Sequence, residues 1–323
     1  MVPTRPENEP RNADADTVYE RFVALTCYVS TSPRSRKYEG DDDMWDMQHR
    51  LEEAVMNCLT PERTGETPQR AIYLLGDSHA AALAMGLQAA FNGIAAVVWT
   101  AIGAGCGYLA APVIAREFEC FDCQCGDCDC ESYNSADCWG ASDQVPLCRS
   151  YIDSATRAME QNLQPCDIVV VHHQRAKWGL VGSARYHAQM EFLRNVQLMV
   201  QGKGAKLVII GDAMGLPVEA DYCIPSEMSP DAGDRCKVQT TPQEVDALAD
   251  HVSGRELAQE EGTFFMPIVS HFCDEDLTSC GAIIPGTETM AYHDDEHLST
   301  AGALYLWPFL CDFFSSNGLL GTD

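Results

Sequence analysis

The chain has 323 residues, of which 46% are hydrophobic and 21% charged, so it is long and apolar enough to bury a sizeable core. Its formal net charge is -27, from 48 acidic and 21 basic residues. This charge repels nucleic-acid backbones and anionic membrane surfaces, so neither is expected as a partner.

Cysteine usage indicates the compartment. Sixteen cysteines favour disulfide bonds, and therefore an extracellular location or a secretory or organellar lumen. The start of the chain lacks the apolar segment of a signal peptide. Three explanations stay open: a signal was omitted from this chain, export uses another route, or the cysteines are reduced.

One uncharged stretch, residues 80–114, has the composition of a membrane span. Several glycines and Asn92 interrupt it. We therefore predict a buried helix followed by a buried strand, and no membrane span in this chain.

Residues 1–68 are predicted to form an N-terminal arm and helices packed on the core. The first 15 residues are polar and rich in Pro, Asn, Asp and Glu, which is typical of a loosely ordered arm. Helical periodicity covers residues 17–30 and 44–59. The acidic residues 41–43 suit the N-terminus of the second helix.

From residue 69 to 323 the pattern predicts one α/β domain. Short apolar runs predict strands at 71–75, 94–99, 167–171, 205–210 and 264–268. Helical patterns lie at about 79–91, 150–163, 186–201, 242–261 and 300–314. Such a βαβ series predicts a parallel sheet of about five strands, covered on both faces, with ligands at the carboxyl ends of the strands.

A cysteine-rich insertion is predicted at residues 116–149. Seven cysteines lie in it, at positions 120, 123, 125, 128, 130, 138 and 148. Because seven is odd, complete oxidation requires a partner outside the segment, and Cys106 and Cys166 are the near candidates. The same spacing also suits a thiolate cluster that binds zinc.

Two further pairs favour disulfides over zinc. Cys223 and Cys236 are close in sequence, as are Cys273 and Cys280, and both pairs have the spacing of loop closures.

A candidate nucleophile lies in the stretch Gly76-Asp77-Ser78-His79-Ala80, between a predicted strand and a predicted helix. In that position the Ser78 hydroxyl points into the crevice above the sheet, and the N–H groups of the helix start favour negative charge. The alternative is an ordinary turn, since turns use Gly, Asp and Ser for conformational reasons.

A candidate base lies just before the last predicted helix. Asp294 and His297 are three residues apart, so the carboxylate can fix the imidazole tautomer while the other ring nitrogen accepts the serine proton. The alternative is a surface histidine and an acidic run that complements the helix N-terminus.

Together these two motifs resemble the SGNH, or GDSL-like, hydrolase superfamily. The sequence looks most similar to the soluble SGNH domain attached to acyltransferase-3 membrane proteins, also through residues 169–178 and 204–217. The resemblance spans about residues 70–312. It implies a three-layer α/β/α sandwich with the flavodoxin-like strand order of the SGNH fold.

The resemblance also implies roles for individual residues. Ser78 corresponds to the nucleophile, His297 to the base and Asp294 to the carboxylate that orients it. Gly105, with Gly103 as a near alternative, corresponds to the glycine whose N–H joins that of the serine in the oxyanion hole.

The third motif of the superfamily departs from the pattern, because this chain has no asparagine at the corresponding place. Either Gln174 or Arg175 substitutes for it, or the oxyanion hole has two donors. His172 and His173 end the same predicted strand, and they either line the substrate pocket or serve only as structural residues.

These residues predict a serine esterase that removes or transfers O-acetyl groups on a carbohydrate through an acyl-enzyme on Ser78, with no cofactor and no metal. The absence of a membrane acyl-donor partner within the chain favours hydrolysis. The alternative is a catalytically idle SGNH-like module, a disulfide-stapled structural or glycan-binding component with partners in an extracellular assembly. A distance beyond about 5 Å between His297 Nε2 and Ser78 Oγ would favour that alternative.

Overall fold

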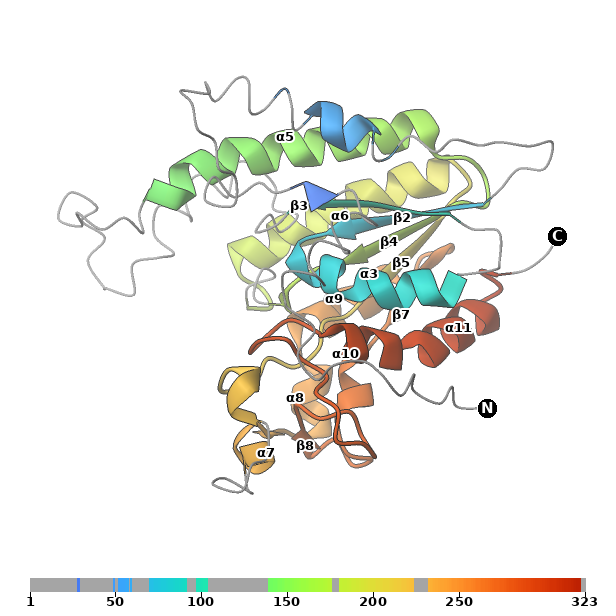
Figure 1. Cartoon of the computed structure of the whole chain (residues 1–323). Coiled ribbons are helices and arrows are strands. Elements are labelled where there is room, and N and C mark those ends of the chain that lie inside the picture. The colour runs from blue at the N-terminus through green and yellow to red at the C-terminus, as the bar shows by residue number, and fades with distance from the viewer. Residues whose placement is uncertain are drawn as a thin grey trace.

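The structure is a computed structural model that describes residues 28–29, 49, 52–57, 59, 70–91, 97–103, 139–175, 180–223 and 232–320. In these ranges a parallel sheet lies between two layers of helices (Figure 1). The strands of this sheet are β1 (Tyr28–Val29), β2 (Ala71–Gly76), β3 (Val97–Gly103), β4 (Ile168–His172), β5 (Lys206–Ile210) and β7 (Thr263–Met266). The larger helices are α3 (Ser78–Phe91), α5 (Trp139–Asn162), α6 (Ala184–Gly202), α9 (Ala249–Leu257), α10 (Thr300–Tyr305) and α11 (Trp307–Ser316).

Both faces of the sheet are buried, as the continuous apolar strands require. All six residues of β2 are buried. Tyr73 and Leu75 point to a core shared with α5, α6 and α9, whereas Ile72 and Leu74 point to a second core shared with α3 and α11. Figure 1 shows α5 and α6 on the opposite side of the sheet from α3 and α11.

The strand order is β1-β3-β2-β4-β5-β7, and all neighbouring pairs are parallel. All five predicted strands are present, and the two-residue β1 adds a sixth at the edge. Without β1, the order is that of a flavodoxin-like sheet, which confirms the predicted fold class. In such a sheet the crevice for ligands opens where the order reverses, between β2 and β4.

A smaller unit follows β5. It contains the short helices η2 (Ala220–Cys223), α7 (Ala232–Arg235), α8 (Pro242–Asp246) and η3 (Val269–Phe272), and the antiparallel strands β6 (Val238–Gln239) and β8 (Ser279–Cys280). The two predicted short-range disulfides, Cys223–Cys236 and Cys273–Cys280, are confirmed in this unit.

The predicted disulfide partners of the cysteine-rich insertion are Cys106 and Cys166. Cys166 is a free, exposed thiol, so its predicted role as a disulfide partner of the insertion is wrong. Cys106 and the cysteines at 120–138 lie outside the described residues, and the zinc alternative lies there with them.

Several predicted boundaries are corrected. Residues 28–29, expected in a helix, form β1, because the edge of β3 offers parallel backbone hydrogen bonds that override local periodicity. The helix α5 begins at residue 139, inside the predicted insertion; Gly140 and Pro146 weaken the helical signal there.

Two predicted long helices are each divided. Between α8 and α9, Leu248 has a non-helical ψ of 138° and is the N-cap residue of α9. In place of the predicted helix 300–314, α10 ends at Tyr305 and α11 begins at Trp307, with Pro308 as its second residue. Proline lacks the N–H that would continue the first helix, which accounts for the break.

In the described part of the chain, no helix combines the length and the apolar composition that crossing a membrane requires.

Candidate active site

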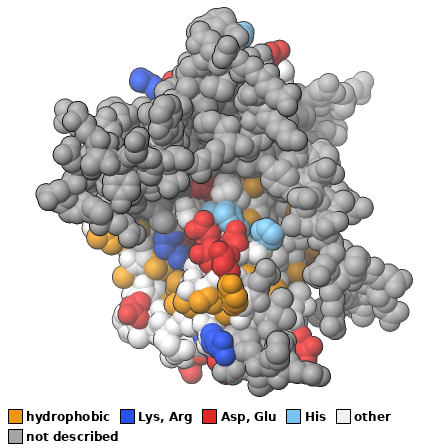
Figure 2. Space-filling model, turned by 60° about the vertical axis from the view of Figure 1, so that its left-hand side comes forward, with side chains coloured by type: hydrophobic (Ala, Val, Ile, Leu, Met, Phe, Trp, Pro, Cys, Tyr) orange, Lys and Arg blue, Asp and Glu red, His pale blue; other side chains and the backbone are white. Residues whose placement is uncertain are grey.

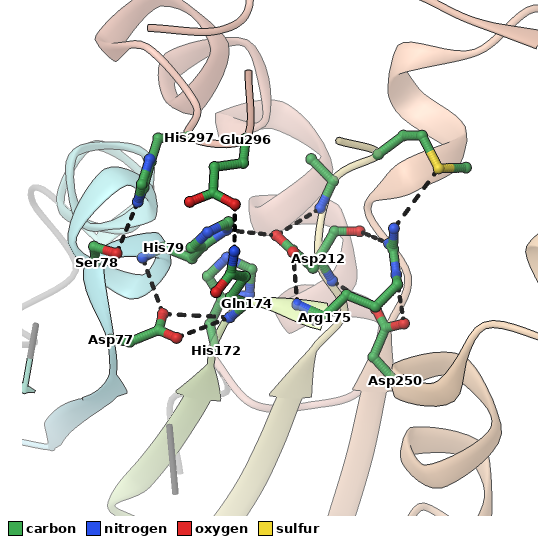
Figure 3. A network of polar contacts seen from close by, with 12 residues as sticks. Asp77, Ser78, His79, His172, Gln174, Arg175, Asp212, Asp250, Glu296 and His297 are labelled. Atoms are coloured by element: carbon green, nitrogen blue, oxygen red, sulfur yellow. Dashed lines mark hydrogen bonds and ion pairs between the residues drawn. The ribbon is translucent and has the colours of Figure 1, made fainter. Parts of the chain in front are cut away.

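The candidate site lies at the carboxyl edge of the sheet, where β2, β4 and β5 end side by side (Figure 3). The predicted nucleophile Ser78 is the first residue of α3, two residues after β2. Gly76 ends β2, and a Cβ atom there would lie 1.8 Å from the carbonyl oxygen of His172. Only glycine allows β2 and β4 to approach so closely just before the serine.

The three side chains predicted to act together are joined by hydrogen bonds. His297 Nε2 lies 2.7 Å from Ser78 Oγ, and His297 Nδ1 lies 2.8 Å from Asp294 Oδ2. The first distance is well inside the 5 Å limit that separates the two interpretations of the sequence. In this tautomer Nδ1 donates to the carboxylate and Nε2 accepts from the serine hydroxyl.

Asp294 is held as a carboxylate by its own loop. Its Oδ1 accepts the backbone N–H groups of Glu296, at 2.9 Å, and His297, at 2.6 Å. Partial burial alone would raise the pKa of Asp294, but the hydrogen bonds from the His297 ring and these backbone groups hold it well below its usual range. The orienting group therefore stays ionised at neutral pH.

The loop that carries His297 is anchored on both sides. The His293 N–H donates to the His297 carbonyl at 2.8 Å, which closes the loop. Ser299 caps α10 by accepting the Gly302 N–H at 3.1 Å. Beyond it, α11 packs on α3 through Phe314 and Phe91, whose ring centroids are 4.9 Å apart.

Asp77 ties the ends of β2 and β4 together. It is buried, and its carboxylate accepts the backbone N–H of His79 at 3.0 Å and that of Gln174 at 3.1 Å. The first bond caps the start of α3 directly after Ser78. Asp77 therefore fixes the backbone around the candidate nucleophile.

A second buried network lies beside the first. Asp212, which follows β5, accepts His79 Nδ1–H at 3.0 Å and the Arg175 backbone N–H at 2.8 Å. Asp250, on α9, accepts Arg175 Nε–H and the Asp212 backbone N–H, both at 2.8 Å. Figure 3 shows this series of contacts running from His79 through Asp212 and Arg175 to Asp250.

The two candidate substitutes for the missing asparagine are engaged elsewhere. The Gln174 side-chain amide donates to the Glu296 carboxylate. The Arg175 guanidinium binds Asp250 and donates to the Asp212 carbonyl oxygen at 2.6 Å. In Figure 3 the Arg175 side chain runs away from Ser78.

Of the two glycine candidates, the structure describes Gly103. Gly103 is the last residue of β3, whose neighbour Ile102 is paired with Gly76, so its backbone lies at the same edge of the sheet as Ser78. Gly105 lies outside the described residues.

His172 and His173 are both enclosed by the protein. His172 Nδ1 lies 3.1 Å from the Ile210 carbonyl oxygen, and His173 Nε2 lies 2.6 Å from the Gln189 side-chain amide nitrogen. Burial lowers the pKa of both rings, that of His173 to about 4, so both are neutral at physiological pH. Each ring therefore has a hydrogen-bond partner inside the protein.

The sequence analysis assigned no role in the site to Asp77, His79, Asp212, Asp250 or Glu296. The positions of Asp77 and Asp212 in the sequence could have indicated them. Each is an acidic residue that follows an apolar strand and a single glycine, at the edge of the sheet where ligands are expected. Asp250 carries no such signal, because it lies on a helix and reaches the site only through the fold.

One group of three potential metal ligands exists in the part of the chain that the structure describes. His79, Glu296 and His297 each offer one ligand atom, and these atoms lie within 4.8 Å of one another. An ion there would compete with Ser78 if it took Nε2 of His297. In Figure 2 acidic and histidine side chains gather at one place on the described surface.

Comparison with known protein families identifies the same superfamily as the sequence motifs. A family model described as "SGNH domain (fused to AT3 domains)" matches residues 39–310, beginning earlier in the chain than the motifs at Ser78 suggested. No curated protein sequence matches the chain significantly.

Solved structures are similar at low identity. The periplasmic domain of a lipopolysaccharide acetyltransferase from Salmonella ser. Paratyphi A is 12% identical, with a TM-score of 0.49, over 87% of this chain and 99% of that one. A proposed acylhydrolase from Bacteroides fragilis is 11% identical, with a TM-score of 0.40, over 84% and 97%. A proposed GDSL-like lipase from Parabacteroides merdae is 12% identical, with a TM-score of 0.38, over 80% and 100%.

Proposed function

The chain belongs to the family of SGNH domains found fused to AT3 domains, and we propose that it is a serine esterase acting on O-acetyl groups of a carbohydrate. The observation that carries the proposal is the unbroken series of hydrogen bonds from Ser78 Oγ through His297 to Asp294. Such a series activates a serine hydroxyl as a nucleophile.

In the proposed first step Ser78 Oγ bonds to the carbonyl carbon of the ester while its proton moves to His297 Nε2. Asp294 stabilises the imidazolium that results. The tetrahedral intermediate then expels the sugar hydroxyl, which takes the proton from His297, and leaves an acetyl group on Ser78. Backbone N–H groups at the start of α3, with that of Gly103 or Gly105, are the proposed donors to the oxyanion.

In the second step a water or a sugar hydroxyl attacks the acetyl-enzyme. His297 takes the proton of the attacking group and returns one to Ser78, which releases acetate or an acetylated sugar. Both outcomes use the same three residues. We propose hydrolysis as the main reaction, with transfer to a sugar hydroxyl as the outcome that the acceptor experiment below distinguishes.

The proposed location is an oxidising compartment, either extracellular or a secretory or organellar lumen. The two disulfides support it, since such bonds are rare in reducing compartments. The domain division at residue 69 is part of the same proposal, together with a cysteine-rich insertion that ends before α5 begins at residue 139.

A second candidate is a catalytically idle module that binds glycans or serves as a structural component. The observation that favours it is the engagement of Gln174 and Arg175 with Glu296 and Asp250, which leaves no side-chain amide in the place of the family's asparagine.

Hydrolysis of p-nitrophenyl acetate tests the proposal between about pH 6 and 9, with Ser78→Ala as the inactive variant. Ser315→Ala, an exposed serine on α11, is the matched control. We expect Ser78→Ala to lose at least about a thousandfold in kcat/KM and the control to lose nothing. A wild-type protein that is inactive throughout this range would support the idle module.

The acyl acceptor is tested separately. Acetylated xylan oligosaccharides are incubated with the protein, with and without an unacetylated oligosaccharide, and both free acetate and acetylated acceptor are measured by mass spectrometry. Free acetate as the main product supports the esterase, whereas acetyl transfer that exceeds hydrolysis overturns that choice.

A further inference from the structure

The loop that carries His297, residues 293–297, has to be held in place relative to Ser78. Hydrogen bonds within the loop fix its own shape, because Asp294 Oδ1 accepts the backbone N–H groups of Glu296 and His297. These bonds do not fix the position of the loop over the start of α3, which belongs to a distant part of the chain. The contact between Ser78 and His297 therefore depends on bonds from the loop to the edge of the sheet.

Two hydrogen bonds make that connection. The Leu216 N–H, in the segment after β5, donates to the Asp295 carbonyl oxygen at 2.6 Å. The Gln174 side-chain amide, after β4, donates to the Glu296 carboxylate. The first bond joins two backbone groups, so replacing a side chain leaves it in place. The second depends on one pair of side chains.

Gln174 is also bound to the turn that holds the candidate nucleophile. Its backbone N–H donates to the buried Asp77 carboxylate, at 3.1 Å from Oδ2. Asp77 also accepts the His79 N–H at 3.0 Å, which caps α3 directly after Ser78. Figure 3 shows Gln174 between Asp77 and Glu296. One residue therefore joins the backbone around the serine to the loop that carries the base.

The alignment of reacting groups matters for the rate, because a displacement of about 1 Å can cost roughly a hundredfold. We propose that Gln174 is a positioning residue, which sets the distance between Ser78 Oγ and His297 Nε2 by holding Glu296, and that it is not a donor to the oxyanion. This inference rests on the proposed esterase function. The amide of Gln174 then serves the alignment of base and nucleophile, and the oxyanion is bound by backbone N–H groups.

The first test exchanges the two side chains and measures p-nitrophenyl acetate hydrolysis. Gln174→Glu places two carboxylates face to face, so we expect kcat to fall about ten- to a hundredfold while KM changes less than about threefold. Adding Glu296→Gln restores one donor and one acceptor with their places exchanged, and should return kcat to within about fivefold of wild type. An amide that bound the oxyanion could not be restored in this way, because a carboxylate would remain beside the developing charge. A double variant no faster than Gln174→Glu alone overturns the inference.

The matched control is Asp295→Asn, which removes one negative charge from the same loop at an exposed side chain. Combined with Gln174→Glu, it should recover nothing. A recovery equal to that given by Glu296→Gln would mean that net charge is responsible, and would overturn the inference.

If Gln174→Glu does not fold, alanine variants take its place. Gln174→Ala and Glu296→Ala each remove the same hydrogen bond, so their effects on kcat should not add. The double variant should therefore be no slower than the slower single variant, and additive losses overturn the inference.

Crystal structures of wild type and Gln174→Ala test the geometry without an activity assay. In the variant we expect the distance between Ser78 Oγ and His297 Nε2 to exceed about 3.5 Å, the limit of a hydrogen bond. A distance that stays at 2.7 Å overturns the inference. If wild type and Ser78→Ala hydrolyse the ester at the same rate, the esterase proposal fails, whereas the two structures still decide whether Gln174 positions the loop.

Discussion

Ser78 Oγ and His297 Nε2 lie 2.7 Å apart, although 219 positions separate the two residues in the chain. The contact exists because the loop before α10 folds over the start of α3, and α11 packs along the same helix. The geometry of the candidate site is therefore a property of the C-terminal helices as much as of the sheet.

Asp294→Asn tests the orienting role of the carboxylate. An amide can donate to His297 Nδ1 and so favour the wrong ring tautomer, and we expect kcat to fall about 10³–10⁴-fold with little change in KM. The control is Asp295→Asn, because that neighbouring side chain is exposed. Steady-state kinetics at pH 7.5 measure both, and an Asp294→Asn variant within threefold of wild type would contradict the prediction.

The pKa of His79 predicts how stability depends on pH. It is about 9 in the folded state and about 6.5 when unfolded, so the folded state binds the extra proton between these values. The stabilisation is complete below about pH 6.5 and is lost as pH rises through 9, an effect of about 3 kcal/mol. Urea unfolding from pH 6 to 10 should show this decrease in wild type but not in His79→Gln; parallel curves would disprove it.

Gly76→Ala tests the close approach of β2 and β4. The added Cβ would meet the His172 carbonyl oxygen at 1.8 Å, and a backbone atom cannot move aside cheaply. We expect a loss of at least about 3 kcal/mol in the free energy of unfolding, or failure to fold. Gly182→Ala, where nothing lies within 4 Å but φ is +85°, is the comparison for backbone strain alone and should cost about 1 kcal/mol. Equal stability of the two variants would contradict the steric explanation.

The disulfide Cys223–Cys236 is expected to stabilise the small unit after β5. It joins residues 13 positions apart, and both cysteines are fully buried. The double variant Cys223→Ala/Cys236→Ala should lose about 3 kcal/mol by the chain-entropy estimate. Cys166→Ser, which changes a free exposed thiol, should lose nothing. Thermal unfolding of both variants measures the difference, and an unchanged midpoint in the double variant would refute it.

Local patterns predict much of this fold because its strands are short, apolar and buried on both faces. Such strands as β2 and β4 differ sharply from the helices between them, so all five were recognisable. The edge strand β1 was not, since two residues carry no periodicity and their conformation depends on pairing with β3. The breaks at Leu248 and Leu306 were also missed, because apolar spacing continues across them.

The candidate site likewise has a part that sequence motifs predict and a part that they do not. The proximity of Ser78, Asp294 and His297 was predictable from short motifs on two loops. The partners of Arg175 were not, since Asp250 lies 75 positions away on a helix without a recognisable motif. Contacts that depend on how helices dock on the sheet cannot be read from local spacing.

The order of the site's parts along the chain affects when activity can appear during synthesis. A ribosome makes Ser78 and the whole parallel sheet before it reaches Asp294 and His297, and domains begin to fold from their N-terminal side. A nascent chain that has already formed the sheet therefore holds a serine without its base. The proposed esterase activity therefore begins only after α10 and α11 have left the ribosome and docked on α3.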